Sequence, residues 1–126
     1  MPLKQFVTLF VFGLLHCYAH GVENNNMANV PGTYARTPKT LIDVQTVQDK
    51  NFPFTISIFE NLDNLCSLEG NAKMIDPFRA SAIYNDCFLV FNFDPKHTQV
   101  KINTKGCAQT CKGKVQTLVD GIYSKQ

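Results

Sequence analysis

The sequence predicts a small domain of the α+β class: an antiparallel sheet of four or five strands with a C-terminal helix docked onto it by disulfides. Two observations lead to this prediction. Several short segments alternate apolar and polar residues with the period of a half-buried strand. The segment that follows residue 106 instead repeats apolar residues at helical spacing. The pattern leaves one alternative open, an all-β sandwich that carries the helix as an appendage.

The first residues have the layout of a secretory signal peptide. Lys4 is followed by an uncharged run over 6–15, and Ala19 provides a small residue for cleavage. The run is too short to span a bilayer, which requires about 20 apolar residues. We therefore expect a signal peptide at 1–19, a secreted extracellular mature chain and no transmembrane segment.

The mature chain divides into a leader and one domain. Segment 20–39 is rich in Asn, Pro and Gly and poor in large apolar side chains, so it predicts a flexible leader. Residues 40–126 have a length that suits a single domain. At its start, alternation over 42–46 and again over 54–58, with a short polar break between them, indicates an antiparallel hairpin.

The stretch 61–86 gives the weakest signal. Leu62, Leu65 and Cys66 have the spacing of one face of a short helix, which Gly70 would end. The later part, 78–84, alternates like a strand, although Asp-Pro just before it also suits a helix start. We expect a helical turn first and a strand second.

The segment 87–93 is the most apolar of the mature chain, and it is apolar on both faces of a strand. It therefore predicts a central strand that is covered on both sides. The residues Asp-Pro-Lys-His at 94–97 indicate a tight turn. Alternation over 99–103 then predicts an amphipathic partner strand that ends at Gly106.

The C-terminal segment predicts an amphipathic helix. Its stripe has spacings of four, four, three and four, and it consists of Cys107, Cys111, Val115, Leu118 and Ile122. Two glycines within it weaken a helix by about 1 kcal/mol each relative to alanine. This helix therefore depends on packing and on covalent bridges.

The mature chain has an even number of cysteines: Cys66, Cys87, Cys107 and Cys111. In an oxidising compartment this parity predicts two disulfides. The last two lie on one face of the predicted helix, so each is expected to reach another element rather than its neighbour. The spacing leaves both of the remaining pairings open. A four-thiolate zinc site is the competing interpretation, but these cysteines do not form two closely spaced couples, and we expect no metal.

The sequence offers little for catalysis. A nuclease or hydrolase site using His97, with Glu60, Arg79 and Lys101, can be assembled on paper, but no spacing requires it. The chain has no glycine-rich phosphate loop, nucleophile elbow or zinc-binding helix motif. We expect neither a catalytic residue nor a cofactor.

Charge is divided unevenly along the mature chain. Segment 41–94 has eight acidic and three basic residues, whereas 95–126 has six lysines and one acid. The first part therefore carries a net charge of minus five and the second plus five. Five lysines of the second part form a possible basic binding patch: Lys96, Lys101, Lys105, Lys112 and Lys114.

The overall layout resembles that of the small secreted effector proteins of plant-pathogenic fungi, rusts among them. The shared features are a signal peptide, an Asn- and Pro-containing leader, a small domain and four cysteines. Salivary and venom proteins of invertebrates have the same layout. The resemblance covers the whole chain but no specific motif, so it assigns no residue. It implies a non-enzymatic protein that binds a host or extracellular partner protein. The lysines of the last third leave open a structural or defence protein that binds an anionic polymer or surface, and a small secreted hydrolase or nuclease using His97 is the other alternative.

Overall fold

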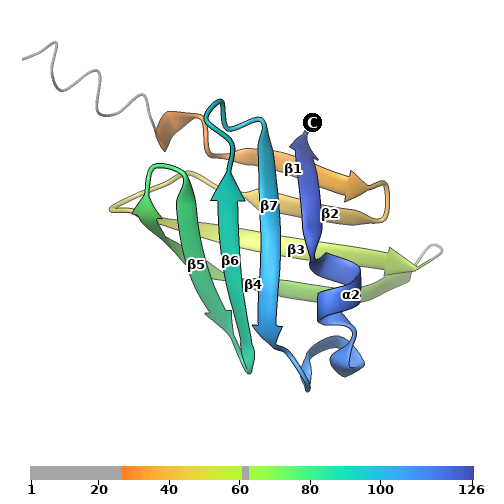
Figure 1. The fold of residues 1–126 in the computed structure, drawn as a ribbon. Helices are drawn as coiled ribbons and strands as arrows, with labels where there is room; N and C mark the ends of the chain where they lie inside the picture. The colour runs from red at the N-terminus through yellow and green to blue at the C-terminus, as the bar shows by residue number, and fades with distance from the viewer. Residues whose placement is uncertain (1–26, 61–62) are drawn as a thin grey trace, which may run out of the picture.

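A computed structural model describes residues 27–60 and 63–126, so the predicted signal peptide at 1–19 lies outside the described part. The chain forms a closed antiparallel barrel in which each strand pairs with the next and the last strand pairs with the first (Figure 1). The strands are β1 (Gly32–Thr37), β2 (Thr40–Val44), β3 (Asn51–Glu60), β4 (Asp63–Asp76), β5 (Arg79–Tyr84), β6 (Cys87–Phe93), β7 (Gln99–Gly106) and β8 (Gly121–Lys125).

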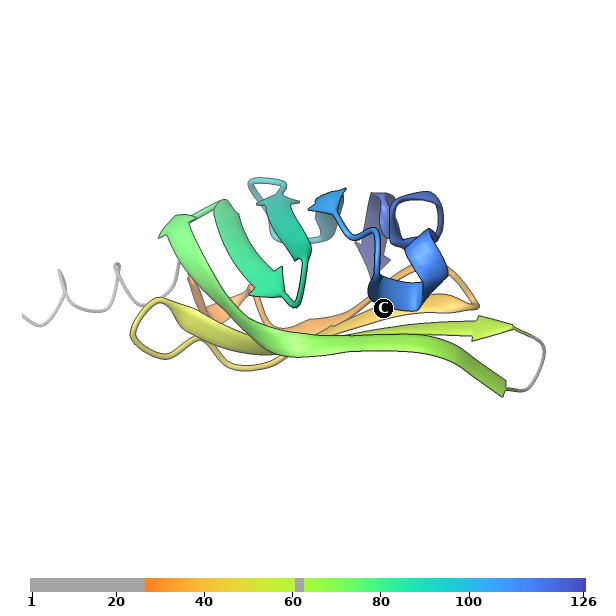
Figure 2. The same cartoon turned by 90° about the horizontal axis from the view of Figure 1, so that it is seen from below.

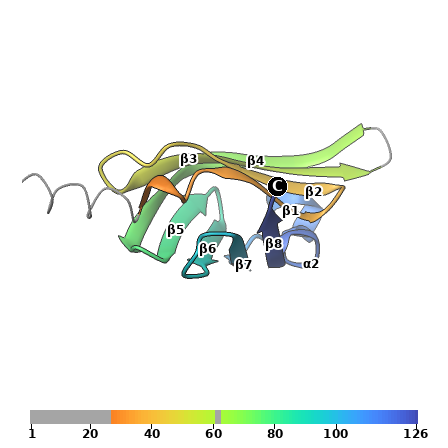
Figure 3. The same cartoon turned by 90° about the horizontal axis from the view of Figure 1, so that it is seen from above.

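The barrel is flattened into two layers. Strands β1–β4 form one layer, and β5–β8 cross it steeply in front (Figure 1). The views from below and from above both place the long β3–β4 hairpin on one side and the shorter strands of the other layer on the opposite side (Figures 2 and 3). We call the outward surface of β5–β8 the front face and that of β1–β4 the back face.

Two short helical segments lie between β7 and β8. They are a 3-10 turn η1 (Thr110–Gly113) and a one-turn helix α2 (Val115–Val119). Val115 and Val119 are fully buried, so α2 contributes to the core beside the last strand. Arg36 of β1 donates a hydrogen bond of 2.8 Å to the Leu118 carbonyl, which ties the end of α2 to the other layer. No helix within the described residues is long and apolar enough to cross a membrane.

The interior of the barrel is filled by side chains. Inward positions of every strand contribute, and the largest fully buried side chains include Tyr34, Tyr123, Phe52 and Phe91. Phe52 and Phe91 pack edge to face with ring centroids 5.5 Å apart. Both tyrosine hydroxyls donate to backbone carbonyls, and burial raises the pKa of Tyr34 to about 12. The barrel is therefore a packed scaffold.

The predicted α+β class is wrong, because the chain is almost entirely sheet and its strands close on themselves. The alternative of a sandwich also differs, since one continuous sheet forms both layers. Closure depends on the pairing of β1 with β8, where Tyr34 meets Lys125 and Ala35 meets Ser124. Strand alternation reports which face of a strand is buried, but it contains no information about such a distant partner.

The predicted C-terminal helix is also wrong. Only Val115–Val119 is α-helical, and Gly121–Lys125 is a strand in which Ile122 is 56% exposed. The backbone explains the break, because Cys111 and Lys112 have φ values of 51° and 57° and lie in the left-handed region. No α-helix continues through such residues.

Two other segments differ from the sequence analysis. β1 begins at Gly32, inside the segment 20–39 that was predicted to be a flexible leader. The expected helical turn near Cys66 is part of strand β4 from residue 63 onward, and Leu62 lies outside the described residues. The predicted hairpin of β2 and β3, the strand near 78–84 and the pair formed by β6 and β7 are confirmed.

Candidate functional site

The front face is built from three rows of outward side chains that run across the strands. The register places Ile83 opposite Phe88, and Phe88 opposite Lys105. The second row contains Ser81, Val90 and Asn103, and the third contains Arg79, Asn92, Lys101 and Ile122. Directly opposed side chains on one face of a sheet are in contact, so each row forms a continuous strip.

The first row carries an exposed apolar pair. Ile83 is 74% exposed and Phe88 is 41% exposed, although the two are direct neighbours. The expectation that the strand Cys87–Phe93 is covered on both faces is therefore wrong: Leu89 and Phe91 are buried inside, whereas Phe88 faces solvent. Half-buried Val90 extends the apolar surface into the second row. Adjacent large apolar side chains in solvent are a feature of interaction sites.

Lysines border this apolar surface. Lys105 lies beside Phe88, and Lys101 projects from the same side of β7; both are exposed. No acidic residue occupies an outward position of β5–β8. We call Ile83, Phe88, Val90, Lys101 and Lys105 the front patch.

The structure divides the five lysines of the predicted basic patch. Lys101 and Lys105 share the front face. Lys112 belongs to η1 and Lys114 precedes α2, so both lie beyond the end of β7 at which Lys105 is found. Lys96 is in the turn between β6 and β7, at the opposite end of β7. All five are exposed. The five lysines therefore form three groups: Lys101 and Lys105 on the front face, Lys112 and Lys114 at the adjoining turn, and Lys96 by itself at the other end of β7.

Carboxylates brace three turns at the ends of the front strands. Asp86 accepts hydrogen bonds from the Gln109 amide and the Thr110 hydroxyl, each 2.8 Å long, and these bonds hold its pKa below the usual range. Asp94 is bonded in the same way within the turn before β7, and the Gln99 amide is the main cause of its lowered pKa. Asp76 accepts from the Phe78 amide and pairs with an arginine, which also lowers its pKa. These acids are engaged locally, so the nearby lysines remain the free charges of the face.

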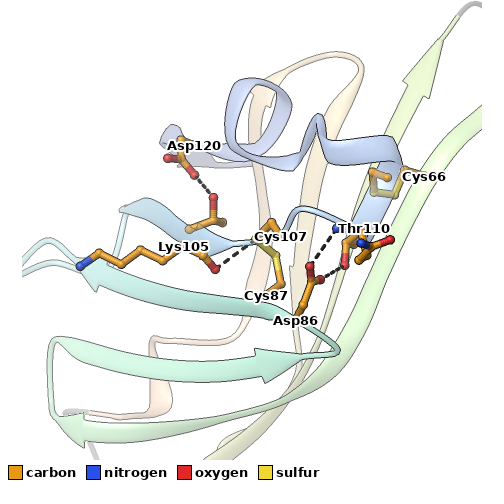
Figure 4. Close-up of a disulfide and its surroundings, with 10 residues drawn as sticks. Cys66, Asp86, Cys87, Lys105, Cys107, Thr110 and Asp120 are labelled. Carbon is orange, nitrogen blue, oxygen red and sulfur yellow. Dashed lines mark hydrogen bonds between the residues drawn. A yellow bond between two sulfur atoms is a disulfide. The ribbon is translucent and has the colours of Figure 1, made fainter.

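Two disulfides form, as the sequence predicted, in the pairs Cys66–Cys111 and Cys87–Cys107. The second bridge lies directly under the front patch, because Cys87 precedes Phe88 in β6. Figure 4 shows this bridge next to Asp86, whose side chain reaches Thr110, the first residue of η1. The floor of the patch is therefore a cross-linked, hydrogen-bonded part of the barrel.

His97 occupies a packing position. It is 4% exposed, its ring stacks on Phe78 with centroids 5.6 Å apart, and Phe93 lies 5.9 Å away on a tilted plane. Its Nε2 atom is 2.9 Å from the Pro77 carbonyl oxygen, with which a protonated nitrogen forms a hydrogen bond. The other residues of the hypothetical nuclease or hydrolase site do not gather around His97 in the described part. Arg79 is paired with Asp76, Lys101 faces outward, and the Glu60 side chain lies outside the described residues.

Surface hollows lie away from the front patch. One of about 530 Å³ is lined by uncharged side chains that include Pro31, Gln45, Asn51 and Asn71. Another of about 310 Å³ lies between the β1–β2 hairpin and α2, where Arg36 and Lys39 line it. In the ranges 27–60 and 63–126 no three His, Cys, Asp or Glu side chains are grouped to hold a metal ion.

No family model, curated protein or solved structure matches this chain. Sequence reasoning found Lys101 and Lys105 but missed the apolar part of the patch. The apolar part was visible in the sequence as the second apolar face of the strand 87–93. The sequence analysis predicts that another layer covers this face. Ile83 gave no separate signal, because an exposed and a buried isoleucine look alike in an alternating strand.

Proposed function

We propose that the protein is a secreted, non-enzymatic binding protein, effector-like in its layout, which binds a partner protein through the front patch. The observation that supports this function is the exposed pair Ile83 and Phe88 on a face that has free lysines and no outward acid. The proposal of secretion rests on the predicted signal peptide, and the two disulfides are compatible with it.

The energetics favour an apolar contact at the centre of the patch. Full burial of a large apolar side chain stabilises a complex by about 1.5–3 kcal/mol, and Ile83 and Phe88 retain much of that surface in solvent. The strands beneath are rigid because their inward side chains are buried and Cys87 is bridged to Cys107. A preordered surface loses little conformational entropy on binding.

The charges determine which partner fits. Lys105 lies beside the apolar pair and Lys101 lies one row beyond Val90, so a partner with acidic groups around an apolar centre is complementary. Such charges at the rim accelerate association and favour the correct orientation, and their effect decreases with ionic strength.

A polyanion such as a sulfated polysaccharide is the second candidate ligand. It is favoured by the exposed lysines that continue from the front face onto η1 and α2, namely Lys105, Lys112 and Lys114. A polyanion makes no use of Ile83 and Phe88, which is why the apolar pair favours the protein partner.

Two sets of variants separate these candidates. The immobilised mature protein and its I83T/F88T variant are incubated with the same extracellular or host extract, and the captured proteins are compared. We expect an acidic protein whose capture is lost with I83T/F88T and kept with I75T. Ile75 is a matched control because it is an isoleucine on β4 with 60% exposure.

The polyanion is tested with heparin at graded salt. A polyanion-binding protein elutes earlier after K101E/K105E and unchanged after I83T/F88T. If the I83T/F88T protein captures the same proteins as the wild type, the proposed protein-binding function is wrong.

A further inference from the structure

The two disulfides differ in how the protein holds them. Cys87 and Cys107 are 1% and 4% exposed. Cys87 is paired with Gly106 in the β6–β7 ladder, and the Cys107 amide donates a hydrogen bond of 3.1 Å to the Asp86 carbonyl. The backbone therefore keeps these two sulfur atoms next to each other even without the covalent bond.

The other bridge joins two elements that have little else in common. Cys66 lies in β4 and Cys111 in η1, 45 residues apart in the sequence, and both are half-buried. Among the described residues, no backbone or side-chain hydrogen bond connects β4 to η1. Once this bridge is opened, no hydrogen bond between the two elements keeps the thiols adjacent, so their effective concentration is lower than that of Cys87 and Cys107.

The backbone of η1 also favours release. Cys111, Lys112 and Gly113 have φ values of 51°, 57° and 75°, so three consecutive residues are in the left-handed region. Only glycine adopts this region without steric cost. The bridge holds Cys111 in this conformation, and a free Cys111 is able to leave it.

We propose that Cys66–Cys111 is a site of thiol–disulfide exchange with an external dithiol, and that its reduction releases η1 from the β3–β4 hairpin. One thiolate of the dithiol attacks a sulfur of the bridge, forms a mixed disulfide and expels the other cysteine as a thiolate, which takes up a proton. The second thiol then closes a cyclic disulfide on the reagent and expels the remaining cysteine, which is also protonated. Two electrons pass from the dithiol to the bridge.

The opening is local because other contacts hold the rest of the segment. Asp86 retains its bonds to Gln109 and Thr110 ahead of the bridge. Behind it, Val115 and Val119 stay in the core. Lys112 and Lys114 therefore become mobile while the front patch keeps its shape. The redox state thus controls the two lysines that extend the front patch towards η1.

The exchange is tested on the native mature protein without any partner, so its outcome is independent of the proposed binding function. The protein is treated with dithiothreitol, samples are alkylated with iodoacetamide at intervals, and the cysteines are mapped by mass spectrometry. We expect Cys66 and Cys111 to gain alkyl groups while the Cys87–Cys107 peptides remain linked until denaturant is added. Opening of Cys87–Cys107 first, or of both bridges at the same rate, would overturn the proposal.

Hydrogen exchange tests whether the opening is local. In the C66A/C111A variant we expect loss of protection at residues 111–114, with the amides of β6 and β7 protected as in the wild type. The C87A/C107A variant is the matched comparison, because it removes the buried bridge and leaves Cys66–Cys111 intact. Loss of protection throughout the barrel of C66A/C111A would contradict a local release.

Discussion

The front and back faces of this barrel are made by the same strand alternation, yet they present different chemistry. The front face carries Ile83 and Phe88 in contact and the lysines of β7. Across the back face, the register aligns Thr33, Asp43, Thr55 and Glu69 in one row of hydroxyl and carboxylate groups. Hydroxyl and acidic side chains remain hydrated at little cost, whereas adjacent apolar side chains in water are favoured where another surface covers them.

The two faces also separate the charges that the sequence divides along the chain. The basic third supplies β7, η1 and β8, which all belong to the front layer. Asp43 and Glu69 point outward from the back layer, and the acids of the front turns are held in local hydrogen bonds. The separation of acidic and basic residues along the sequence therefore becomes a difference in charge between the back and front faces.

The largest expected effect comes from placing a charge at the centre of the front patch. The F88D substitution puts a carboxylate where the partner's apolar surface docks, and burying it unpaired costs several kcal/mol. We expect at least a ~100-fold loss of partner affinity, about 2.7 kcal/mol, measured by calorimetry or surface plasmon resonance. I75D, which changes an exposed isoleucine of β4, is expected to bind like the wild type. Equal losses in the two variants would remove the distinction between the faces.

Charge reversal at the edge of the patch has a smaller effect. K105E changes the lysine opposite Phe88, and we expect a loss of about tenfold, mainly in the association rate. K50E has the same change in net charge in the turn before β3 and is expected to leave binding unchanged. The difference between the two variants should decrease at high salt, because the charges are exposed and screened. A loss that is independent of salt would contradict an electrostatic role for Lys105.

The sequence predicted the buried side of most strands but not the barrel. Residues such as Ile42, Ile56 and Val100 alternate with polar neighbours and lie inside as expected. β1 was assigned to the leader because Tyr34 is its only large apolar residue and Pro31 precedes it. That tyrosine becomes significant only when β8 closes on β1, since its full burial depends on the complete barrel.

The candidate site was predictable in part for the same reason. Lysines in an amphipathic strand mark the face that is exposed to solvent, so the sequence correctly predicts Lys101 and Lys105 on the outward side of β7. Phe88 was assigned to a covered face because a strand with two apolar faces is usually enclosed. Here the available helix is a single turn, and α2 packs at the side of β7 and β8 rather than over β5 and β6 (Figure 1).

A change of pH tests whether the front turns are held by their carboxylates. The folded pKa of Asp86 lies below its unfolded value, so its stabilisation is complete above the ordinary aspartate pKa of about 3.9 and is lost as pH falls through the lower folded pKa. We expect D86N to be less stable than the wild type at neutral pH, and the difference to shrink as pH falls below the ordinary aspartate pKa, in urea unfolding followed by circular dichroism. D43N, on the back face, should change the unfolding free energy by less than about 0.5 kcal/mol at neutral pH. A difference between D86N and the wild type that does not shrink with falling pH would point to packing rather than to the charged hydrogen bonds.

The smallest effect is expected at Ile122, and it determines how far the front patch extends. Ile122 is 56% exposed and opposes Lys101, but the row of Ser81, Val90 and Asn103 lies between it and the pair Ile83 and Phe88. Rim residues of an interface stay partly hydrated and contribute little energy. We therefore expect I122T to weaken binding by about twofold, roughly 0.4 kcal/mol, in the same assay as F88D. A loss as large as that of F88D would show that the apolar contact spans the whole front face, and that Lys101 lies within the interface rather than at its border.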